Sequence, residues 1–175
     1  MTTVFVVPHT HWDREWYEIA ARFRQRLVPI LDEIVEVLSR DPSFECFLLD
    51  GHTAILDDYL VVRPDQRAAI SGLVKAGRLL VGPWCVLSDE FLSWDECLVR
   101  NLLVGRRSAE SLGGPLKLGY RPDAFGHPAA LPTILAGFDI RNGVLWRGYG
   151  GEPGQEADVF RWAGPDDSEV IFHHL

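Results

Sequence analysis

The chain has 175 residues, 47% hydrophobic and 24% charged, a composition that fits one soluble globular domain and excludes a disordered chain. Its net charge of -8 argues against a nucleic acid or an anionic membrane as a partner. Cys46, Cys85 and Cys97 are odd in number and widely spaced, which excludes a disulfide framework and predicts free thiols in a cytoplasmic protein.

Short apolar runs alternate with longer amphipathic stretches. The run at residues 4–7 predicts a buried first strand; it is too short for a membrane span and lacks the basic flank of a signal peptide. Apolar residues from Phe23 to Leu38 recur at three- and four-residue spacing, which predicts a helix that Pro29 kinks or divides. Further strands are expected at 44–49, 78–81, 117–120, 143–146, 159–162 and 169–173, and further helices at 54–59, 65–76, 93–111 and 129–136.

Two local patterns refine these elements. Ser93 and Glu96 have the spacing of a capping box, which predicts the start of the third of these further helices. Residues 148–154 are rich in glycine but lack a phosphate-binding spacing, so they are interpreted as a flexible connection.

The alternation of strands and helices predicts an α/β fold with a mainly parallel sheet of βα units. Sites in such folds form at the carboxyl ends of the strands. Polar and aromatic residues follow each confident strand, whereas the helix-to-strand connections are ordinary turns. The residues concerned are 9–16, 50–52, 83–90, 121–127 and Arg147.

His11 and Asp13 follow the first predicted strand. Residues two apart in extended chain point the same way, so the imidazole and the carboxylate can bind one divalent ion, although Asp13 could instead cap the following helix. His9 points to the opposite face, which favours a structural hydrogen-bonding role.

Two stretches carry a family resemblance: Pro8-His9-Thr10-His11-Trp12-Asp13-Arg14-Glu15-Trp16-Tyr17 and Tyr120-Arg121-Pro122-Asp123-Ala124-Phe125-Gly126-His127. Together they resemble glycoside hydrolase family 38, the retaining α-mannosidases, with Asp50-Gly51, Gly82-Pro83-Trp84 and Asp89-Glu90 in the expected order between them. The resemblance implies that residues 1–175 are the N-terminal portion of a catalytic domain that folds as a seven-stranded α/β barrel.

The resemblance also implies roles for individual residues. His11, Asp13 and Asp123 would hold a divalent metal, usually zinc, with cobalt or manganese as alternatives. Asp123 would in addition be the catalytic nucleophile. Trp16, Asp89, Arg121 and Phe125 are expected to contact the substrate, an α-mannoside or a mannose-containing oligosaccharide.

The family's fourth metal ligand and its acid/base aspartate would lie beyond Leu175, so the 175-residue piece is expected to be inactive alone. An incomplete barrel exposes strand edges and apolar surface, which would allow association into a homo-oligomer.

Several residues keep a second interpretation. Asp123 could be a turn residue after Pro122, and Trp16 could be core. Asp50 is favoured as a helix N-cap, and Cys85 as an inert thiol.

Charged residues of the two motifs have local alternatives as well. Arg14 and Glu15 are favoured as a local ion pair, and Asp89 could cap a turn. His127 either orients Asp123 or starts a helix.

Two other functions stay open on the sequence. A metal-dependent carbohydrate deacetylase also uses an α/β barrel with His and Asp ligands, but it needs a metal-bound water and a histidine base. A carbohydrate-binding fragment without catalysis would show no metal-linked behaviour.

Overall fold

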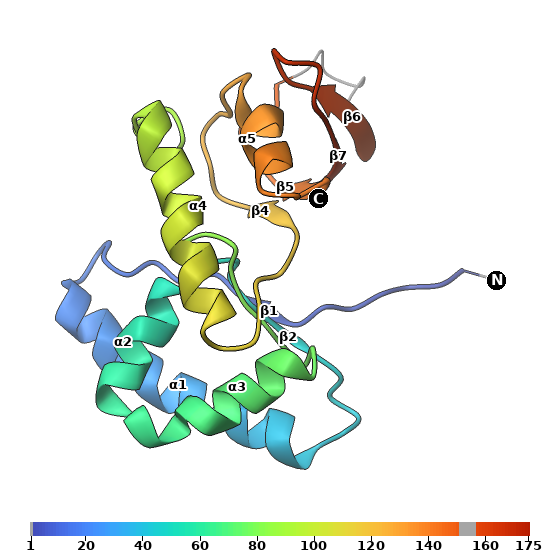
Figure 1. The fold of residues 1–175 in the computed structure, drawn as a ribbon. Helices are drawn as coiled ribbons and strands as arrows, with labels where there is room; N and C mark the ends of the chain where they lie inside the picture. The colour runs from blue at the N-terminus through green and yellow to red at the C-terminus, as the bar shows by residue number, and fades with distance from the viewer. Residues whose placement is uncertain (1, 151–156) are drawn as a thin grey trace.

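The computed structural model describes residues 2–150 and 157–175. Two small sheets with helices packed around them make up the molecule (Figure 1). Residues 151–154 of the predicted glycine-rich loop lie outside the described residues. None of the helices in the described part of the chain combines the length and apolarity needed to cross a membrane.

The first sheet has three parallel strands in the order β1 (His9–Thr10), β2 (Phe47–Leu49) and β3 (Leu79–Leu80). The helices α1 (Ala20–Arg40), α2 (Ala54–Val62) and α3 (Arg67–Lys75) lie together beside it, with the short 3-10 helix η1 (Pro64–Gln66) before α3 (Figure 1). The predicted apolar face of α1 packs into this part of the core through Leu27, Leu31, Val35 and Leu38. The helix continues through Pro29 without a break.

The second sheet has the strand order β4 (Gly119–Arg121), β5 (Asn142–Leu145), β7 (Glu169–His174) and β6 (Val159–Ala163). The pairs β4–β5 and β5–β7 are parallel, and only β6 runs antiparallel to its neighbour. A second core cluster joins this sheet to α5 (Leu131–Gly137) and to Leu102 of α4 (Asp95–Glu110).

The α/β class and the mainly parallel pairing predicted from the sequence are confirmed. Within residues 2–150 and 157–175 the strands form two open sheets and do not close into a barrel. A backbone hydrogen bond from Leu116 N–H to the Val81 carbonyl, 2.8 Å, joins the segments that follow β3 and precede β4.

The predicted first strand is wrong in position, because pairing begins only at His9. Val4, Phe5 and Val6 are each more than three-quarters exposed, and this segment extends away from the body (Figure 1). The reason is the conformation of the segment that precedes β2. In the parallel register His9 lies opposite Leu48, so residues 4 and 5 would lie opposite residues 43 and 44, which form a turn closed by Asp41. A strand needs an extended neighbour to pair with.

The predicted capping box is also wrong. The helix α4 begins at Asp95 with Trp94 as its N-cap, and no side chain caps it. Ser93 donates its hydroxyl to the Asp89 carbonyl at 3.0 Å, and Glu96 pairs with Arg100 at 2.9 Å instead of turning back to the helix start.

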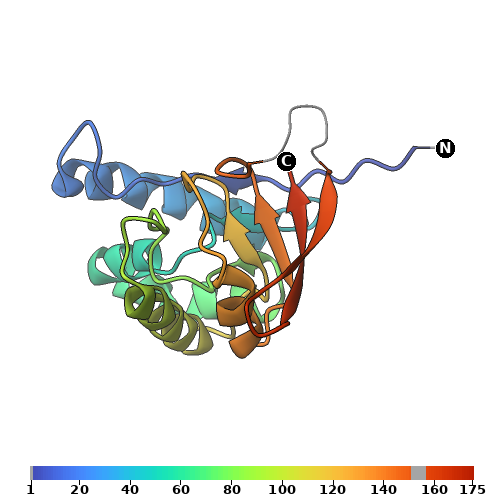
Figure 2. The same cartoon turned by 90° about the horizontal axis from the view of Figure 1, so that it is seen from above.

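The arrows of β4, β5 and β7 point toward one edge of the molecule (Figure 2). Gly51, which follows β2, has a φ of +63°, and a Cβ added there would lie 2.8 Å from the Tyr120 ring of β4. Only glycine allows this close approach, so the turn after β2 packs against β4. The loops after β1, β2, β3 and β4 therefore come together at this edge.

Candidate active site

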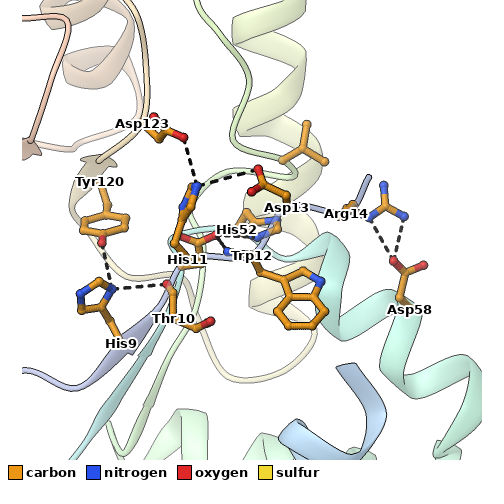
Figure 3. Close-up of polar contacts among 12 residues, drawn as sticks. His9, Thr10, His11, Trp12, Asp13, Arg14, His52, Asp58, Tyr120 and Asp123 are labelled. Atoms are coloured by element: carbon orange, nitrogen blue, oxygen red, sulfur yellow. Dashed lines mark hydrogen bonds and ion pairs between the residues drawn. The ribbon is translucent and has the colours of Figure 1, made fainter. Parts of the chain in front are cut away.

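His11 lies at the centre of the site, between two carboxylates (Figure 3). Its Nε2 is 3.2 Å from Asp123 Oδ2 and 3.8 Å from Asp13 Oδ1. His11 and Asp13 follow β1, whereas Asp123 follows β4, so two distant turns supply the three side chains. The structure thus brings together the three residues expected to hold a metal and supply the nucleophile.

These side chains surround a cavity of about 310 Å³. This volume is at the lower end of the range for small-ligand sites. The loops after β1, β2, β3 and β4 form the walls of the cavity. The residues that line it are His11, Trp12, Asp13, Arg14, Glu15, His52, Val86, Leu87 and Asp123.

The separations between the His11, Asp13 and Asp123 side chains can be compared with those between the ligands of a bound divalent ion. Imidazole nitrogen and carboxylate oxygen both bind zinc at about 2.0–2.2 Å, and two ligands of a tetrahedral ion therefore lie about 3.3 Å apart. The two separations from His11 Nε2, 3.2 and 3.8 Å, bracket that spacing. Among residues 2–150 and 157–175, however, no three metal-binding side chains are already gathered tightly enough to form a complete centre. The pair separations are thus compatible with a shared ion, and the three side chains do not form a complete centre as they stand.

A buried carboxylate supports His11 from the other side. Asp50, fully buried, lies 3.2 Å from His11 Nδ1 and accepts a hydrogen bond from the Trp12 N–H at 2.6 Å. The hydrogen bond to Asp50 is the main reason that the pKa of His11 rises to about 9, and the charges of Asp13 and Asp123 add to the effect against the opposing effect of burial. Burial alone would raise the pKa of Asp50, but its bonds to His11 and His52 outweigh that and lower it.

The expected N-cap role of Asp50 is therefore wrong: Thr53 precedes α2, and no side chain caps that helix. The expected Arg14–Glu15 pair is replaced by a contact between Arg14 Nη2 and Asp58 Oδ2 at 2.9 Å. His9 hydrogen-bonds Tyr120 at 3.3 Å, as expected for a structural histidine. Burial raises the pKa of the Cys85 thiol, which fits the expected inert cysteine.

The sequence placed Arg147 at this edge without assigning it a role, and the structure shows that it forms an ion pair with Asp123 Oδ1. Its guanidinium lies 4.7 Å from the centre of the Phe125 ring and 5.0 Å from that of Trp146. Aromatic faces attract a cation at these distances, so the two rings hold the guanidinium beside Asp123. Its position two residues after β5, at the carboxyl end of a parallel strand, is the sequence signal that placed it at this edge.

The four residues expected to contact substrate do not line the cavity. Trp16 is 75% exposed and packs on Tyr17 with ring centres 5.2 Å apart. Phe125 is 66% exposed and lies beside Arg147. Asp89, partly exposed, accepts a weak hydrogen bond from the Phe91 N–H at 3.4 Å.

Arg121, the fourth of these residues, is buried. Its guanidinium pairs with Glu90, donates to the Ser88 carbonyl and lies 4.6 Å from the centre of the Trp84 ring. His127 contacts the same Glu90 at 3.2 Å and the Arg147 carbonyl at 3.1 Å. It therefore supports the loop that carries Arg147 and makes no contact with Asp123.

The whole chain, residues 1–175, matches the family model described as the glycosyl hydrolases family 38 N-terminal domain. The chain belongs to glycoside hydrolase family 38. It is 38% identical over 180 residues to a protein of Halalkalibacterium halodurans named "Putative mannosylglycerate hydrolase", an alignment that covers 97% of this chain and 20% of that protein. Mouse alpha-mannosidase 2x is 30% identical over 148 residues, which cover 82% of this chain and 13% of that protein.

A solved structure has a similar fold. The alpha-mannosidase from Enterococcus faecalis V583 superposes with a TM-score of 0.90 at 37% identity, over 97% of this chain and 19% of that chain. The chain thus spans about a fifth of the length of these bacterial relatives.

Proposed function

We propose that the full-length protein hydrolyses α-mannosidic bonds with retention, through a covalent glycosyl intermediate on Asp123 and with a bound divalent metal. The observation that carries this proposal is the position of His11 Nε2 between Asp123 and Asp13 at one cavity. The names of the family relatives support mannose-containing compounds as the substrate class.

Asp123 is proposed as the nucleophile. One of its carboxylate oxygens would attack the anomeric carbon while the bond from that carbon to the leaving oxygen breaks, and an acid would give the leaving oxygen a proton. A water would then cleave the glycosyl–aspartate bond, returning the carboxylate. The ion pair with Arg147 would hold one oxygen of Asp123 in place.

The metal would be held by His11, Asp13 and Asp123, with zinc as the proposed ion and cobalt or manganese as alternatives. When bound, it would supply positive charge that binds sugar hydroxyls and stabilises the ionised nucleophile. The remaining ligand and the proton donor are proposed to come from the rest of the full-length protein. That remainder would also close the two sheets into the α/β barrel, and a strand paired with the free edge of β1 would cover the exposed residues 4–7.

For the substrate contacts we retain Trp16 and Phe125 as exposed rings that can stack on a sugar, and Asp89 as a partly exposed polar group. For Arg121 we propose support of the loop after β3, since its guanidinium is buried and paired with Glu90. A cytoplasmic location remains part of the proposal, supported by three free thiols in the described chain.

The test is to trap the intermediate in the full-length protein. A 2-deoxy-2-fluoro-mannosyl donor with a good leaving group should add one glycosyl unit to the peptide that contains Asp123, as seen by mass spectrometry. Asp123→Asn should abolish labelling and lower aryl α-mannoside turnover by at least about 10³-fold, because the amide is a poor nucleophile. Labelling of a different residue, or undiminished turnover by the variant, would exclude this mechanism. Hydrolysis of a sugar N-acetyl group would favour the deacetylase.

A further inference from the structure

We infer that Asp50 is a positioning residue of this site: its carboxylate fixes the imidazole of His11 so that Nε2 faces Asp123 and Asp13. The inference rests on the proposed function, because it concerns how the proposed metal ligand is held. Nothing in the family comparison assigns a role to Asp50, and its place before α2 suggested only a helix cap.

The carboxylate of Asp50 is surrounded by nitrogen atoms of neighbouring residues. Its side chain is fully buried at the end of β2, and three groups from two loops converge on it. His11 Nδ1 lies 3.2 Å from Oδ1, the Trp12 N–H donates to Oδ2 at 2.6 Å, and His52 Nε2 lies 3.2 Å from Oδ2. A buried carboxylate is costly unless donors satisfy it, and the bonds with His11 and Trp12 do so here, which specifies the orientation of both groups.

Because imidazole is rigid, the contact between His11 Nδ1 and Asp50 also orients Nε2, the nitrogen that faces the proposed metal. Nδ1 and Nε2 belong to one rigid ring and point in different directions, so a bond from Nδ1 to a fixed carboxylate restricts where Nε2 can point. Figure 3 shows the ring of His11 with Asp13 and Asp123 at its Nε2 end. A histidine that donates its other N–H to a carboxylate is held in one tautomer and orientation for a metal.

The rest of the local structure keeps Asp50 itself in place. Its backbone has a φ of +45°, which forms the sharp turn from β2 into Gly51. His52, which follows Gly51, forms an isolated parallel bridge with Trp84 in the loop after β3, and the Thr53 N–H donates to the Trp84 carbonyl at 2.9 Å. The loop after β3 therefore holds the backbone that carries Asp50, whereas His11 lies in the loop after β1.

A purely structural role would make a different prediction. If Asp50 served only to tie the loop after β1 through the Trp12 N–H, its loss would lower the stability of the fold without a specific change in metal affinity. The two roles separate when metal affinity is measured on folded protein at a temperature well below the melting point.

The substitution Asp50→Asn suits this test. Asparagine tolerates a positive φ about as well as aspartate, so the turn is preserved. Its side chain has the same size, but one oxygen becomes an NH2 donor that cannot accept from His11 or Trp12. The matched control is Asp139→Asn, the same change at a residue with a φ of +59° that is exposed and pairs with Lys117 on the surface.

Zinc affinity of the full-length protein is measured by competition with a chromogenic chelator, and the visible spectrum of the cobalt form reports the ligand geometry. We expect Asp50→Asn to weaken zinc binding about 10- to 100-fold and to change the cobalt spectrum, as is typical for the loss of a carboxylate that orients a metal-binding histidine. Asp139→Asn should leave both unchanged.

A second variant, His52→Gln, guards against misfolding of the first. It leaves the bonds of Asp50 to His11 and Trp12 in place, so zinc affinity should fall less than about fivefold; a larger fall would overturn the inference. Wild-type zinc affinity in Asp50→Asn would overturn the inference and leave the proposed function intact. Absence of zinc and cobalt binding by the wild type would instead overturn the proposed metal site, and the inference with it.

Discussion

Gly105 lies where α4 presses against the loop after β3, and replacing it by alanine tests how closely the backbone packs there. A Cβ added at this position would lie 2.2 Å from the Trp84 carbonyl carbon and 2.3 Å from both the Cys85 nitrogen and the Pro83 oxygen. Ordinary carbon contacts are about 3.5–4.0 Å. All three clashing atoms are backbone, so no side chain can rotate away, and the loop would have to move by about 1 Å.

Two opposing effects determine how far Gly105→Ala changes the free energy of unfolding. Alanine is favoured over glycine inside a helix by about 0.8–1.0 kcal/mol. Overpacking costs about 1–3 kcal/mol, and movement of the loop would also strain the 2.9 Å hydrogen bond from Thr53 N–H to the Trp84 carbonyl, worth about 1 kcal/mol. The net expectation for Gly105→Ala is a loss of about 2 kcal/mol, or about 4–8 °C in melting temperature for a chain of this size.

Gly72 provides the matched control. It lies in α3, and a Cβ added there would meet nothing within 4 Å. Gly72→Ala should therefore gain up to about 1 kcal/mol, and the two variants should melt about 6–12 °C apart. Differential scanning calorimetry of both variants measures the gap. Equal melting temperatures would show that α4 does not approach the loop as closely as described.

Two further predictions concern stability. Tyr59, fully buried, donates its hydroxyl to Asp32 at 2.6 Å, so Tyr59→Phe should cost about 1 kcal/mol at pH 7. Bonds from Arg63 and then Tyr59 lower the pKa of Asp32, so this stabilisation is present above the unfolded pKa of about 3.9 and is lost as the pH falls through the lower folded value. The melting gap between wild type and variant should therefore narrow below about pH 4, and a constant gap in calorimetry from pH 7 to pH 3 would contradict this. Separately, zinc at about 100 times its dissociation constant should stabilise the protein by about 2.7 kcal/mol and EDTA should reverse this, whereas a melting temperature independent of zinc would argue against a site in the folded state.

The sequence predicted the parts of the fold that depend on local pattern. The periodic apolar face of α1, the parallel α/β class and the gathering of polar residues at strand ends are all properties of short segments. The convergence of His11 with Asp123 followed from the rule that parallel strands share a carboxyl edge, together with the family motifs.

The errors came from partners that local pattern does not contain. Residues 4–7 have a strand-like composition, yet the turn at Asp41 leaves them nothing to pair with. Asp50 precedes a helix as an N-cap would. Its carboxylate instead forms hydrogen bonds with the loop after β1, and His11 in that loop is 39 residues away in sequence. Arg14 likewise prefers the distant Asp58 to its neighbour Glu15. Long-range contacts of this kind become visible only in the folded chain.

His11, Asp13 and Asp123 are proposed to hold one divalent ion. Anomalous diffraction at the zinc absorption edge, from crystals of the full-length protein grown with zinc, would locate that ion. One strong peak is expected about 2.0–2.2 Å from His11 Nε2 and from an oxygen of each of the two aspartates. A peak located elsewhere, or the absence of a peak in crystals grown with excess zinc, would contradict the proposed metal site.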